Sequence, residues 1–239
     1  MIYTTRKTDE LKKLVIIPAY NESLNIEKTV KDVIENAPDF DYVVINDCST
    51  DNTLEILRKN KFSYLNLPVN LGIGGAVQTG YRYAYYHGYD MAVQFDGDGQ
   101  HNASYLRKMA EELANTDANM VIGSRFITKE GFQSSGIRRA GIKHFTRLIK
   151  GLTGETITDP TSGLRIVDRK LLELFKEDYP KDYPEPESTV AILAKGFKVK
   201  EIPAIMNERE GGVSSISMMN GIYYMIKVSI AILIAKLNK

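Results

Sequence analysis

Asp96 and Asp98 are the residues whose types and spacing point most directly to chemistry. They stand one residue apart in Asp96-Gly-Asp-Gly-Gln100, directly after a short apolar run. Two carboxylates this close repel each other unless a cation lies between them. Mg²⁺ accepts carboxylate oxygens and leaves coordination positions open for substrate phosphates, and Gln100 could add a neutral oxygen. Because Asp-Gly is also common in turns, a plain acidic turn is the alternative interpretation.

Two further segments could bind a nucleotide. Asp47 could accept hydrogen bonds from a base or ribose, although it, or Asp51, could instead cap a helix that begins near Thr53. The glycine-rich segment 70–76, which includes Gly75, runs into a helical pattern, where free backbone N–H groups favour phosphate or a close approach of backbone. Its glycines fit neither G-x-G-x-x-G nor a P-loop. The sequence therefore argues against dinucleotide-dependent dehydrogenases and P-loop NTPases.

Arginines follow the acidic segments along the chain and are suited to bind a phosphate acceptor. The guanidinium group matches phosphate oxygens in a bidentate way. A phosphate monoester is already an anion, so it needs positioning more than a general base. The candidates are Arg125, Arg138, Arg139, Arg165 and Arg209. Ser214 or Ser215 could complete the site, and solvated surface positions are the alternative interpretation.

A sugar hydroxyl as acceptor would change the requirement, because an alcohol is a poor nucleophile at neutral pH and needs a general base. Glu187 could be that base, and Glu185 is the alternative in the same segment. The two kinds of acceptor therefore make different demands on this chain.

Short apolar runs alternate with helical patterns along the first half of the chain. We expect strands near 14–18, 42–45, 63–67, 91–95 and 120–123, with helices between them. This alternation is typical of one α/β domain with a doubly wound, mainly parallel sheet. Ligands bind such sheets beyond the carboxyl ends of the strands. The acidic tips that carry Asp47, Asp96 and Asp98 should therefore meet at one edge.

The composition excludes several classes of protein. The 239 residues are 43% hydrophobic and 26% charged, as in an ordinary globular chain. The single cysteine, Cys48, rules out a disulfide scaffold, and a net charge of +1 argues against a nucleic-acid-binding surface. Residues 1–13 carry charges and no apolar core of a secretory signal. The cytoplasm is therefore the default expectation.

The ordered motifs resemble those of family 2 glycosyltransferases with the GT-A fold. They are Ile17-Pro-Ala-Tyr-Asn-Glu22, Asn46 to Thr53, Asn70 to Ala76, Asp96 to His101 and Gly123-Ser-Arg125. The segment Asp159-Pro-Thr-Ser-Gly-Leu-Arg165 is similar to the branch of dolichyl- and undecaprenyl-phosphate sugar synthases. The resemblance covers about residues 12–216. It implies a nucleotide-sugar donor, Mg²⁺ or Mn²⁺, a polyprenyl phosphate acceptor and inversion at the anomeric carbon.

The resemblance also implies roles for individual residues. Nucleotide binding falls to Pro18, Ala19, Tyr20, Glu22, Asp47, Gly75 and Asp96. Metal binding falls to Asp96, Asp98 and Gln100, and acceptor binding to Arg125, Arg138, Arg139, Arg209 and Ser214. The expected catalytic residues are Asp98, Arg125 and Asp159, of which Asp159 could orient the acceptor loop. Asn46, where an aspartate is frequent, and Asn102-Ala103, where a proline is usual, depart from the family pattern without removing a metal ligand.

Two helical segments could contact a membrane surface. Arg139, Lys143, Arg147 and Lys150 share one helical face, with apolar residues on the other. Residues 216–239 are expected to form an amphipathic or apolar C-terminal helix after a domain of residues 1–215. The longest apolar run, 230–235, is far shorter than the ~20 residues of a spanning helix. The helix could lie in the membrane interface or pack in the core.

These observations favour a peripheral enzyme on the cytoplasmic face of the membrane, with a UDP-hexose as donor. A membrane flippase and a second copy of the chain are further partners to consider. Two other functions fit the same motifs: a transferase that extends a lipid-linked glycan, and a non-catalytic nucleotide-sugar-binding subunit. The intact carboxylates argue against the last of these.

Overall fold

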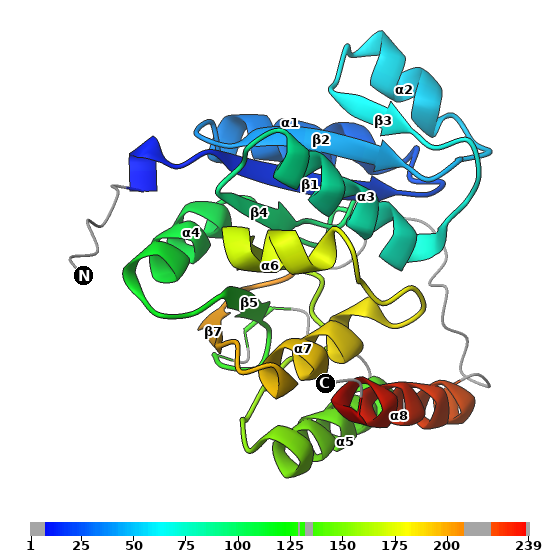
Figure 1. Ribbon diagram of the computed structural model, residues 1–239. Coiled ribbons are helices and arrows are strands. Elements are labelled where there is room, and N and C mark those ends of the chain that lie inside the picture. Colours follow the sequence, from blue (N-terminus) through cyan, green and yellow to red (C-terminus); the bar gives the residue numbers. More distant parts are fainter. Residues whose placement is uncertain (1–7, 129, 132–135, 208–220, 238–239) are drawn as a thin grey trace.

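Seven strands form one sheet in the order β3-β2-β1-β4-β6-β5-β7 (Figure 1). The strands are β1 (Lys13–Ala19), β2 (Asp41–Asn46), β3 (Tyr64–Asn66), β4 (Met91–Gln94), β5 (Met120–Ser124), β6 (Arg165–Asp168) and β7 (Val199–Pro203). The structure is a computed structural model that describes residues 8–128, 130–131, 136–207 and 221–237. Within these ranges, β6 is the strand that runs antiparallel to its neighbours. The expected mainly parallel α/β sheet is confirmed.

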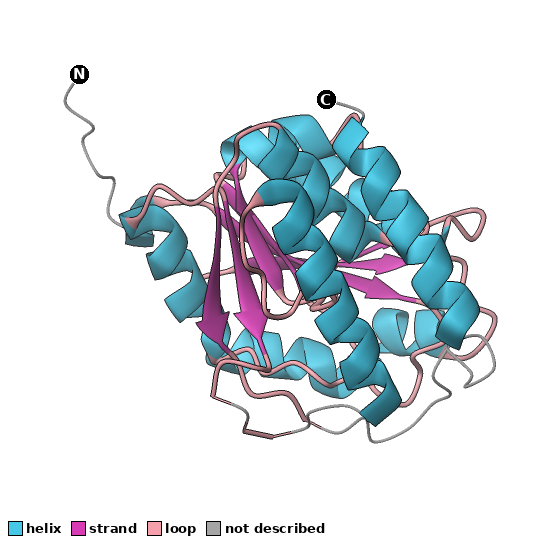
Figure 2. Ribbon diagram, turned by 90° about the horizontal axis from the view of Figure 1, so that it is seen from below, coloured by secondary structure: helices cyan, strands magenta, loops and turns pink. Residues whose placement is uncertain are grey.

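Helices cover both faces of this sheet (Figure 2). One face carries α1 (Ile26–Asn36), α2 (Thr53–Lys59) and α4 (Tyr105–Asn115). The other carries α3 (Gly72–Tyr86), α5 (Gly136–Thr153), α6 (Arg169–Phe175), α7 (Pro184–Ala194) and α8 (Gly221–Leu237). A short 3-10 helix, η1 (Thr8–Glu10), precedes β1.

The two faces of β1 show how the sequence builds these layers. Val15 and Ile17 belong to the core under α1 and α4, whereas Leu14 and Ile16 belong to the core under α3. All four are buried, because a strand covered by helices on both sides needs apolar residues at every position. Helix α3 lies close to β1, since a Cβ at Gly80 would lie 2.9 Å from Ile16 Cγ1 and closer still to Cγ2.

Strands β6 and β7 were not among the strands expected from the apolar runs. Strand β6 lies between β4 and β5, and its first residue, Arg165, pairs with Gln94 on one side and Ile122 on the other. Strand β7 pairs with β5 in parallel at the end of the sheet. The antiparallel insertion brings the start of β6 to the edge at which β4 and β5 end.

Helix α8 has one buried and one exposed apolar face. Val228 and Ile232 are fully buried in the same core as Phe145 of α5, and His144 Nε2 lies 3.0 Å from Ser229 Oγ. The exposed apolar residues of α8 are Ile226, Ile230, Leu233, Ile234 and Leu237. Figure 1 shows α5 and α8 beside each other at the lower end of the molecule. The C-terminal helix therefore packs in the core along one side only.

Helix α5 is amphipathic, as the basic pattern predicted. Arg139, Lys143, Arg147 and Lys150 are exposed, and Phe145 and Ile149 are among the buried residues on the opposite side. None of the helices in the described ranges is both long and apolar enough to cross a membrane. The division of the chain at residue 215 stays a prediction.

Candidate functional site

The tips of β1, β2 and β3 are joined by side-chain hydrogen bonds at the carboxyl edge of the sheet. Asn46 Nδ2 donates to Asn66 Oδ1 at 2.6 Å, and Ser49 Oγ donates to Asn46 Oδ1 at 2.6 Å. Asn21 has a positive φ of 57° and accepts from the Thr50 backbone N–H at 2.8 Å. Asn46, which departs from the family pattern, is thus a buried connector between neighbouring strands.

The residues expected to hold the nucleotide surround this edge. Pro18 and Ala19 are buried in β1, and Tyr20 follows them with 48% of its surface exposed. Glu22 accepts from Asn25 Nδ2 at 3.0 Å, which fixes its carboxylate at the start of α1. The exposed Tyr20 ring beside buried backbone is a surface on which a base could stack.

Asp47 and Asp51 have separate structural roles, which the sequence left open. Asp51 Oδ1 accepts from the Thr53 backbone N–H at 2.9 Å, in a turn directly before α2, whose N-cap residue is Asn52. Asp47 is 3% exposed, and its Oδ1 accepts from the Leu71 N–H at 2.7 Å, just before α3. Asp47 therefore joins the tip of β2 to the glycine-rich segment, and its contact with a nucleotide stays a prediction.

The glycine-rich segment is mostly helix, because α3 already begins at Gly72. Gly75 lies in its first turn, and Gly72 N–H donates to Asn70 Oδ1 at 3.1 Å. Gly74 has a packing role, since a Cβ there would lie 2.5 Å from the Lys181 carbonyl oxygen. Side chains and close packing thus account for part of this segment, and phosphate binding by Gly75 stays a prediction.

Asp96 lies just beyond β4, in contact with two polar side chains. Oδ2 lies 3.1 Å from His101 Nε2, and Oδ1 accepts from Gln94 Nε2 at 3.2 Å. Burial works against ionisation of this carboxyl, but His101, Gln94 and the charge of Arg165 outweigh it and lower the pKa of Asp96. Its side chain keeps 32% of its surface exposed. Asp96 is therefore an ionised carboxylate with an open side.

Asp98 and Gln100 follow in the same turn. Asp98 Oδ1 accepts from the Gln100 backbone N–H at 3.1 Å, and Gln100 Nε2 donates to the Asn207 carbonyl at 3.4 Å. Gly97 allows this turn to lie against β1, since a Cβ there would lie 2.9 Å from the Pro18 carbonyl oxygen. The expected metal ligands are thus beside the expected nucleotide residues.

The donor set of this turn fits a hard divalent cation such as Mg²⁺ or Mn²⁺. Asp96 and Asp98 supply carboxylate oxygens, the ligand type that these ions prefer. Across the described residues, no group of three His, Cys, Asp or Glu side chains could hold a metal ion by itself. A cation here would therefore take its remaining oxygens from a substrate diphosphate and water, which is the usual way in which proteins hold Mg²⁺.

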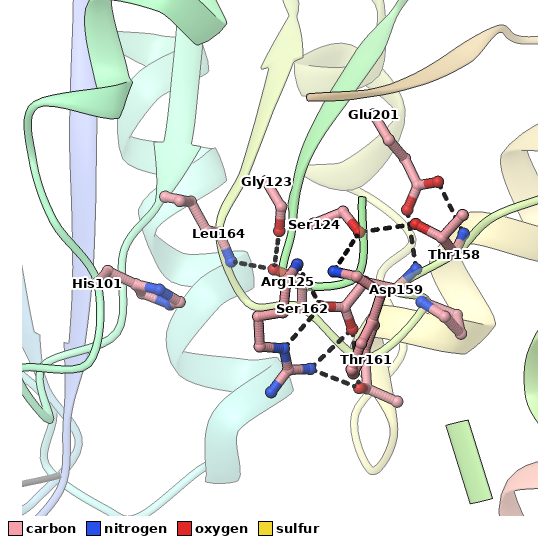
Figure 3. Close-up of polar contacts among 12 residues, drawn as sticks. His101, Gly123, Ser124, Arg125, Thr158, Asp159, Thr161, Ser162, Leu164 and Glu201 are labelled. Atoms are coloured by element: carbon pink, nitrogen blue, oxygen red, sulfur yellow. Dashed lines mark hydrogen bonds and ion pairs between the residues drawn. The ribbon is translucent and has the colours of Figure 1, made fainter. Parts of the chain in front are cut away.

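Arg125, directly after β5, forms a bidentate ion pair with Asp159 (Figure 3). Its Nε lies 2.7 Å from Asp159 Oδ2, and its Nη2 lies 2.7 Å from Oδ1 and 3.0 Å from Thr161 Oγ1. The Asp159 side chain is fully buried, and 13% of the Arg125 side chain is exposed. Glu201 Oε1 accepts from the Asp159 N–H at 2.8 Å, and burial raises the pKa of Glu201. The pair holds a guanidinium group at the sheet edge in a fixed orientation.

Arg165 is not an acceptor-binding arginine in this fold, contrary to the sequence-based suggestion. Its side chain is fully buried at the start of β6. Nε and Nη2 donate to the Ser162 carbonyl at 3.0 and 2.7 Å, and Nη1 donates to the Glu185 carbonyl at 2.9 Å. The physical reason is its place in β6 between β4 and β5, where the carbonyls of Ser162 and Glu185 surround the guanidinium group.

The other expected acceptor residues are only partly within the described ranges. Arg139 is exposed on α5, and Arg138 belongs to the same helix, but its side chain is outside the described part. Arg209 and Ser214 lie outside the described residues altogether. Arg125 is therefore the acceptor candidate with a defined position at the sheet edge.

The two candidate bases point to different places, although they are two residues apart in α7. Glu185 Oε1 accepts from Gln94 Nε2 at 3.2 Å, and the same amide donates to Asp96. Burial and the negative charge of Asp96 raise the pKa of Glu185, and the positive charge of Arg165 offsets part of this rise. Glu187 instead lines a cavity of about 410 Å³ among α6, α7 and α8, to which Lys227 also contributes. Glu185 is therefore the carboxyl beside the candidate metal site.

Sequence reasoning missed four residues that organise this edge: Gln94, His101, Gly163 and Glu201. Gln94 is the last residue of β4 and His101 is in the motif that was read for metal binding, so a signal was present for both. Gly163 lies in the segment Asp159 to Arg165 that carried the resemblance, so a signal was present there too. Glu201 acts through contacts between distant segments, which no local pattern reveals.

Comparison with known proteins relates these features to a family. A model of glycosyl transferase family 2 matches residues 14–175. The UDP-N-acetylglucosamine–dolichyl-phosphate N-acetylglucosaminyltransferase of Methanococcus voltae is 31% identical over 215 residues, covering 79% of this chain and 83% of its own. The polyprenol monophosphomannose synthase of Mycolicibacterium smegmatis is 30% identical over 236 residues, covering 95% and 88%. The resemblance to the polyprenyl-phosphate sugar synthase branch is thereby confirmed.

Solved structures share the fold. A mannosyltransferase from Pyrobaculum calidifontis, in complex with GDP-mannose and Mn²⁺, has a TM-score of 0.66 at 20% identity, covering 94% of this chain and 64% of that chain. Glucosyl-3-phosphoglycerate synthase from Mycobacterium tuberculosis, in complex with Mn²⁺, UDP and phosphoglyceric acid, has a TM-score of 0.72 at 17% identity, covering 96% and 79%. These likenesses confirm the GT-A fold that the motifs predicted.

The position of Glu187 makes stability depend on pH. Burial, with Asp182 and Glu185 nearby, raises the pKa of Glu187 from 4.5 to about 6. The native state therefore binds this proton more tightly than the unfolded chain, so the cost of ionisation is absent below pH 4.5 and complete above about pH 6. Glu187→Gln should raise the free energy of unfolding at pH 7.5 by about 1 kcal/mol after screening by solvent.

Urea unfolding at pH 4 and pH 7.5 measures this effect. The gain should vanish at pH 4, where the native and unfolded carboxyls are both protonated. Glu111→Gln, at an exposed position of α4, is the matched control and should show no such difference between the two pH values. An equal gain for Glu187→Gln at both pH values would contradict the prediction.

Proposed function

The chain belongs to glycosyl transferase family 2, and we propose that it transfers a sugar from a nucleotide-diphosphate sugar to a polyprenyl phosphate. The product is a polyprenyl-phosphate sugar for the assembly of cell-envelope polysaccharide. The relatives from Methanococcus voltae and Mycolicibacterium smegmatis, whose names state a dolichyl-phosphate acceptor and a monophosphomannose product, support this acceptor class.

The observation that carries the proposal is the placement of Arg125 at the same sheet edge as Asp96 and Asp98. Strand β6 alone separates β5, which ends beside Arg125, from β4, which ends beside Asp96. Asp159 binds the Nε and Nη2 edge of the guanidinium group in a bidentate pair, which fixes the orientation of this group. The Arg125 guanidinium group, which is suited to bind an acceptor phosphate, therefore lies at the same edge as Asp96 and Asp98. These two carboxylates are suited to bind a divalent metal ion with its diphosphate.

In this proposal, the residues at each side of the sheet edge bind one of the two substrates. Pro18, Ala19, Tyr20, Glu22, Asp47 and Gly75 bind the nucleotide, and Asp96, Asp98 and Gln100 hold the cation at its diphosphate. Mg²⁺ or Mn²⁺ bound there would supply Lewis-acid stabilisation of the departing diphosphate. Arg125, with Arg138, Arg139, Arg209 and Ser214, binds the acceptor phosphate, and Asp159 orients Arg125.

The acceptor chemistry needs no general base. A phosphate oxygen attacks the anomeric carbon while the bond from that carbon to the nucleotide diphosphate breaks, so no proton has to be removed. Attack from the face opposite the leaving group inverts the anomeric configuration. Residues that position two anions against each other are therefore the main requirement, and Asp98, Arg125 and Asp159 are the residues we assign to it.

The enzyme would act as a peripheral protein at the cytoplasmic face of the membrane, where a polyprenyl phosphate is anchored. The exposed apolar residues of α8 and the basic face of α5 belong to helices that pack against each other. Apolar side chains next to lysines and arginines favour adsorption to an anionic leaflet. We propose that residues 216–239 serve this attachment, while Val228 and Ile232 of α8 pack in the core.

The donor is tested by a thermal-shift panel of UDP-, GDP- and dTDP-sugars with Mn²⁺. We expect UDP-hexoses to raise the unfolding temperature most, because a ligand that binds only the native state stabilises it by mass action. The same panel with EDTA is the control, and it should remove most of the shift. A larger shift with a GDP-sugar would replace UDP in the proposal and leave the acceptor unaffected.

Substitutions at Asp98 and Arg125 should separate the two sides of the reaction. Asp98→Asn should lower kcat/KM for sugar transfer with Mn²⁺ at least about 100-fold, since the cation loses a charged ligand. Arg125→Lys keeps the charge beside Asp159 but loses the planar guanidinium group that Asp159 orients, and it should raise KM for the lipid phosphate about tenfold. A radiolabelled-sugar assay with a short-chain polyprenyl phosphate measures both values.

Arg107→Ala is the matched control for these substitutions. Arg107 lies on α4 in an exposed ion pair with Asp39, away from the carboxyl edge, and its loss should leave both constants unchanged. Full activity of Asp98→Asn with Mn²⁺ would contradict the metal assignment. An unchanged KM for lipid phosphate in Arg125→Lys would place the acceptor elsewhere.

Exposed isoleucines of α8 should determine membrane binding. Replacing Ile226, Ile230 and Ile234 together by Ser should weaken partition to vesicles containing anionic lipid about tenfold or more, because each side chain loses apolar burial. Vesicle sedimentation measures this partition. Substitution is preferable to deletion of residues 222–239, since deletion also removes the buried Val228 and Ile232.

The control for membrane binding replaces exposed apolar residues elsewhere, with Leu24→Ser and Ile34→Ser in one variant. These positions are near or in α1 on the other face of the sheet, and the double variant should partition like the wild type. Equal partition by the α8 variant and the wild type would contradict the proposed attachment.

A further inference from the structure

The segment 159–165 connects the two sides of the candidate site through one stretch of backbone. Asp159, at its start, holds Arg125. Arg165, at its end, is the first residue of β6 and pairs with Gln94 of β4 in an antiparallel register. Continuing this register by two residues places Gly163 opposite Asp96. The acceptor side and the metal side are therefore neighbours along this segment.

Gly163 lies directly against the Asp96 carboxylate. A Cβ at position 163 would lie 2.8 Å from Asp96 Oδ1 and closer still to Oδ2, where no real side chain fits. Gly163 is not among the glycines with positive φ, so backbone conformation does not require glycine here. The requirement is steric, and it comes from the carboxylate.

The other sides of Asp96 are already defined by hydrogen bonds. His101 Nε2 lies 3.1 Å from Oδ2, and Gln94 Nε2 lies 3.2 Å from Oδ1. The backbone of residues 162–164 closes a further side of the Asp96 carboxylate, and we call this stretch the backbone wall. With donors and backbone around it, the carboxylate has one orientation in which its exposed part can meet a cation.

The wall itself is held firmly. Ser162 Oγ donates to the Gly123 carbonyl at 2.7 Å and accepts from the Leu164 N–H at 3.2 Å. Arg165 Nη2 donates to the Ser162 carbonyl at 2.7 Å. Ser162, Gly163 and Leu164 are all buried. The backbone next to Asp96 thus has little freedom to move away from it.

We propose that Gly163 is a positioning residue for the cation-binding carboxylate of Asp96. The segment 159–165 then fixes the cation site and the Arg125–Asp159 pair with one piece of backbone. This inference rests on the proposed function in one respect, namely that Asp96 binds the divalent cation. It adds that the segment 159–165, which holds Arg125, also fixes the position of the Asp96 carboxylate.

The test is a titration of the full chain with Mn²⁺ alone, followed by the electron paramagnetic resonance of free Mn²⁺. Gly163→Ala should weaken Mn²⁺ binding about tenfold or more, the range found when a group that orients a metal ligand is changed. An Mn²⁺ affinity equal to that of the wild type overturns the inference, and so does a wild-type chain that binds no Mn²⁺.

Gly80→Ala is the matched control, because it creates similar crowding in the apolar core between α3 and β1 and not against a carboxylate. Its Cβ would collide with Ile16 under α3, which should lower the unfolding temperature while leaving Mn²⁺ affinity unchanged. Equal losses of Mn²⁺ affinity in both glycine variants would show a general effect of destabilisation and overturn the positioning role.

Ser162→Ala keeps the inference testable if Gly163→Ala does not fold. It adds no atoms and removes the two hydrogen bonds that hold the wall, so Mn²⁺ affinity should fall about fivefold for the loss of about 1 kcal/mol of positioning. Thr153→Ala, which removes a hydroxyl bond at the end of α5, is its control and should not change Mn²⁺ affinity. An unchanged affinity in Ser162→Ala overturns the inference.

Failure of the proposed function gives a different result. A wild-type chain that binds Mn²⁺ but transfers no sugar to polyprenyl phosphate would reject that acceptor, while the Mn²⁺ titration, which needs neither substrate, would still decide the role of Gly163.

Discussion

One buried cation, the guanidinium group of Arg165, holds together the part of the sheet on which both candidate sites depend. Its side chain is fully buried and donates to the carbonyls of Ser162 and Glu185. A charge in such a place is costly unless hydrogen bonds and opposite charges compensate it. The carbonyl contacts tie the segment before β6 to the start of α7. The charge of Arg165 also acts on two nearby carboxyls: it contributes to the lowered pKa of Asp96 and opposes the raised pKa of Glu185.

This arrangement divides the negative charge unequally between two carboxyls that share the Gln94 amide. Burial opposes ionisation of both, but His101 and Gln94 act on Asp96, and its pKa is lowered. Burial and the charge of Asp96 raise the pKa of Glu185. Asp96 therefore keeps its charge for a cation, while Glu185 is the carboxyl of the pair that takes up a proton more readily. A second full charge beside Asp96 would compete with a substrate diphosphate for the same cation.

The sequence predicted the sheet well where burial leaves a local signal and failed where it does not. The runs at 14–18 and 91–95 are apolar because helices cover both faces, and β1 and β4 lie there. Strand β6 is four residues long and begins with Arg165, so it looked like part of a phosphate-binding motif. Glu187 was the expected candidate base, with Glu185 as the alternative in the same segment. Side chains two positions apart on a helix, however, point about 200° away from each other. Only the packing of α7 therefore decides which of the two carboxyls reaches Gln94.

The segment 159–165 precedes its strand, β6, whereas the other motifs of the candidate site follow their strands. The antiparallel direction of β6 explains why this segment reaches the same edge of the sheet. The tips of β1, β2, β4 and β5 reach the edge by their carboxyl ends, and ligands of parallel sheets bind there. A parallel strand in the place of β6 would start about 13 Å away, at the opposite edge. Because β6 runs antiparallel, its amino end pairs with the last residue of β4, and Gly163 arrives against Asp96 while Asp159 reaches Arg125. One reversed strand thus brings a candidate acceptor segment to the edge at which the parallel strands place the candidate donor residues.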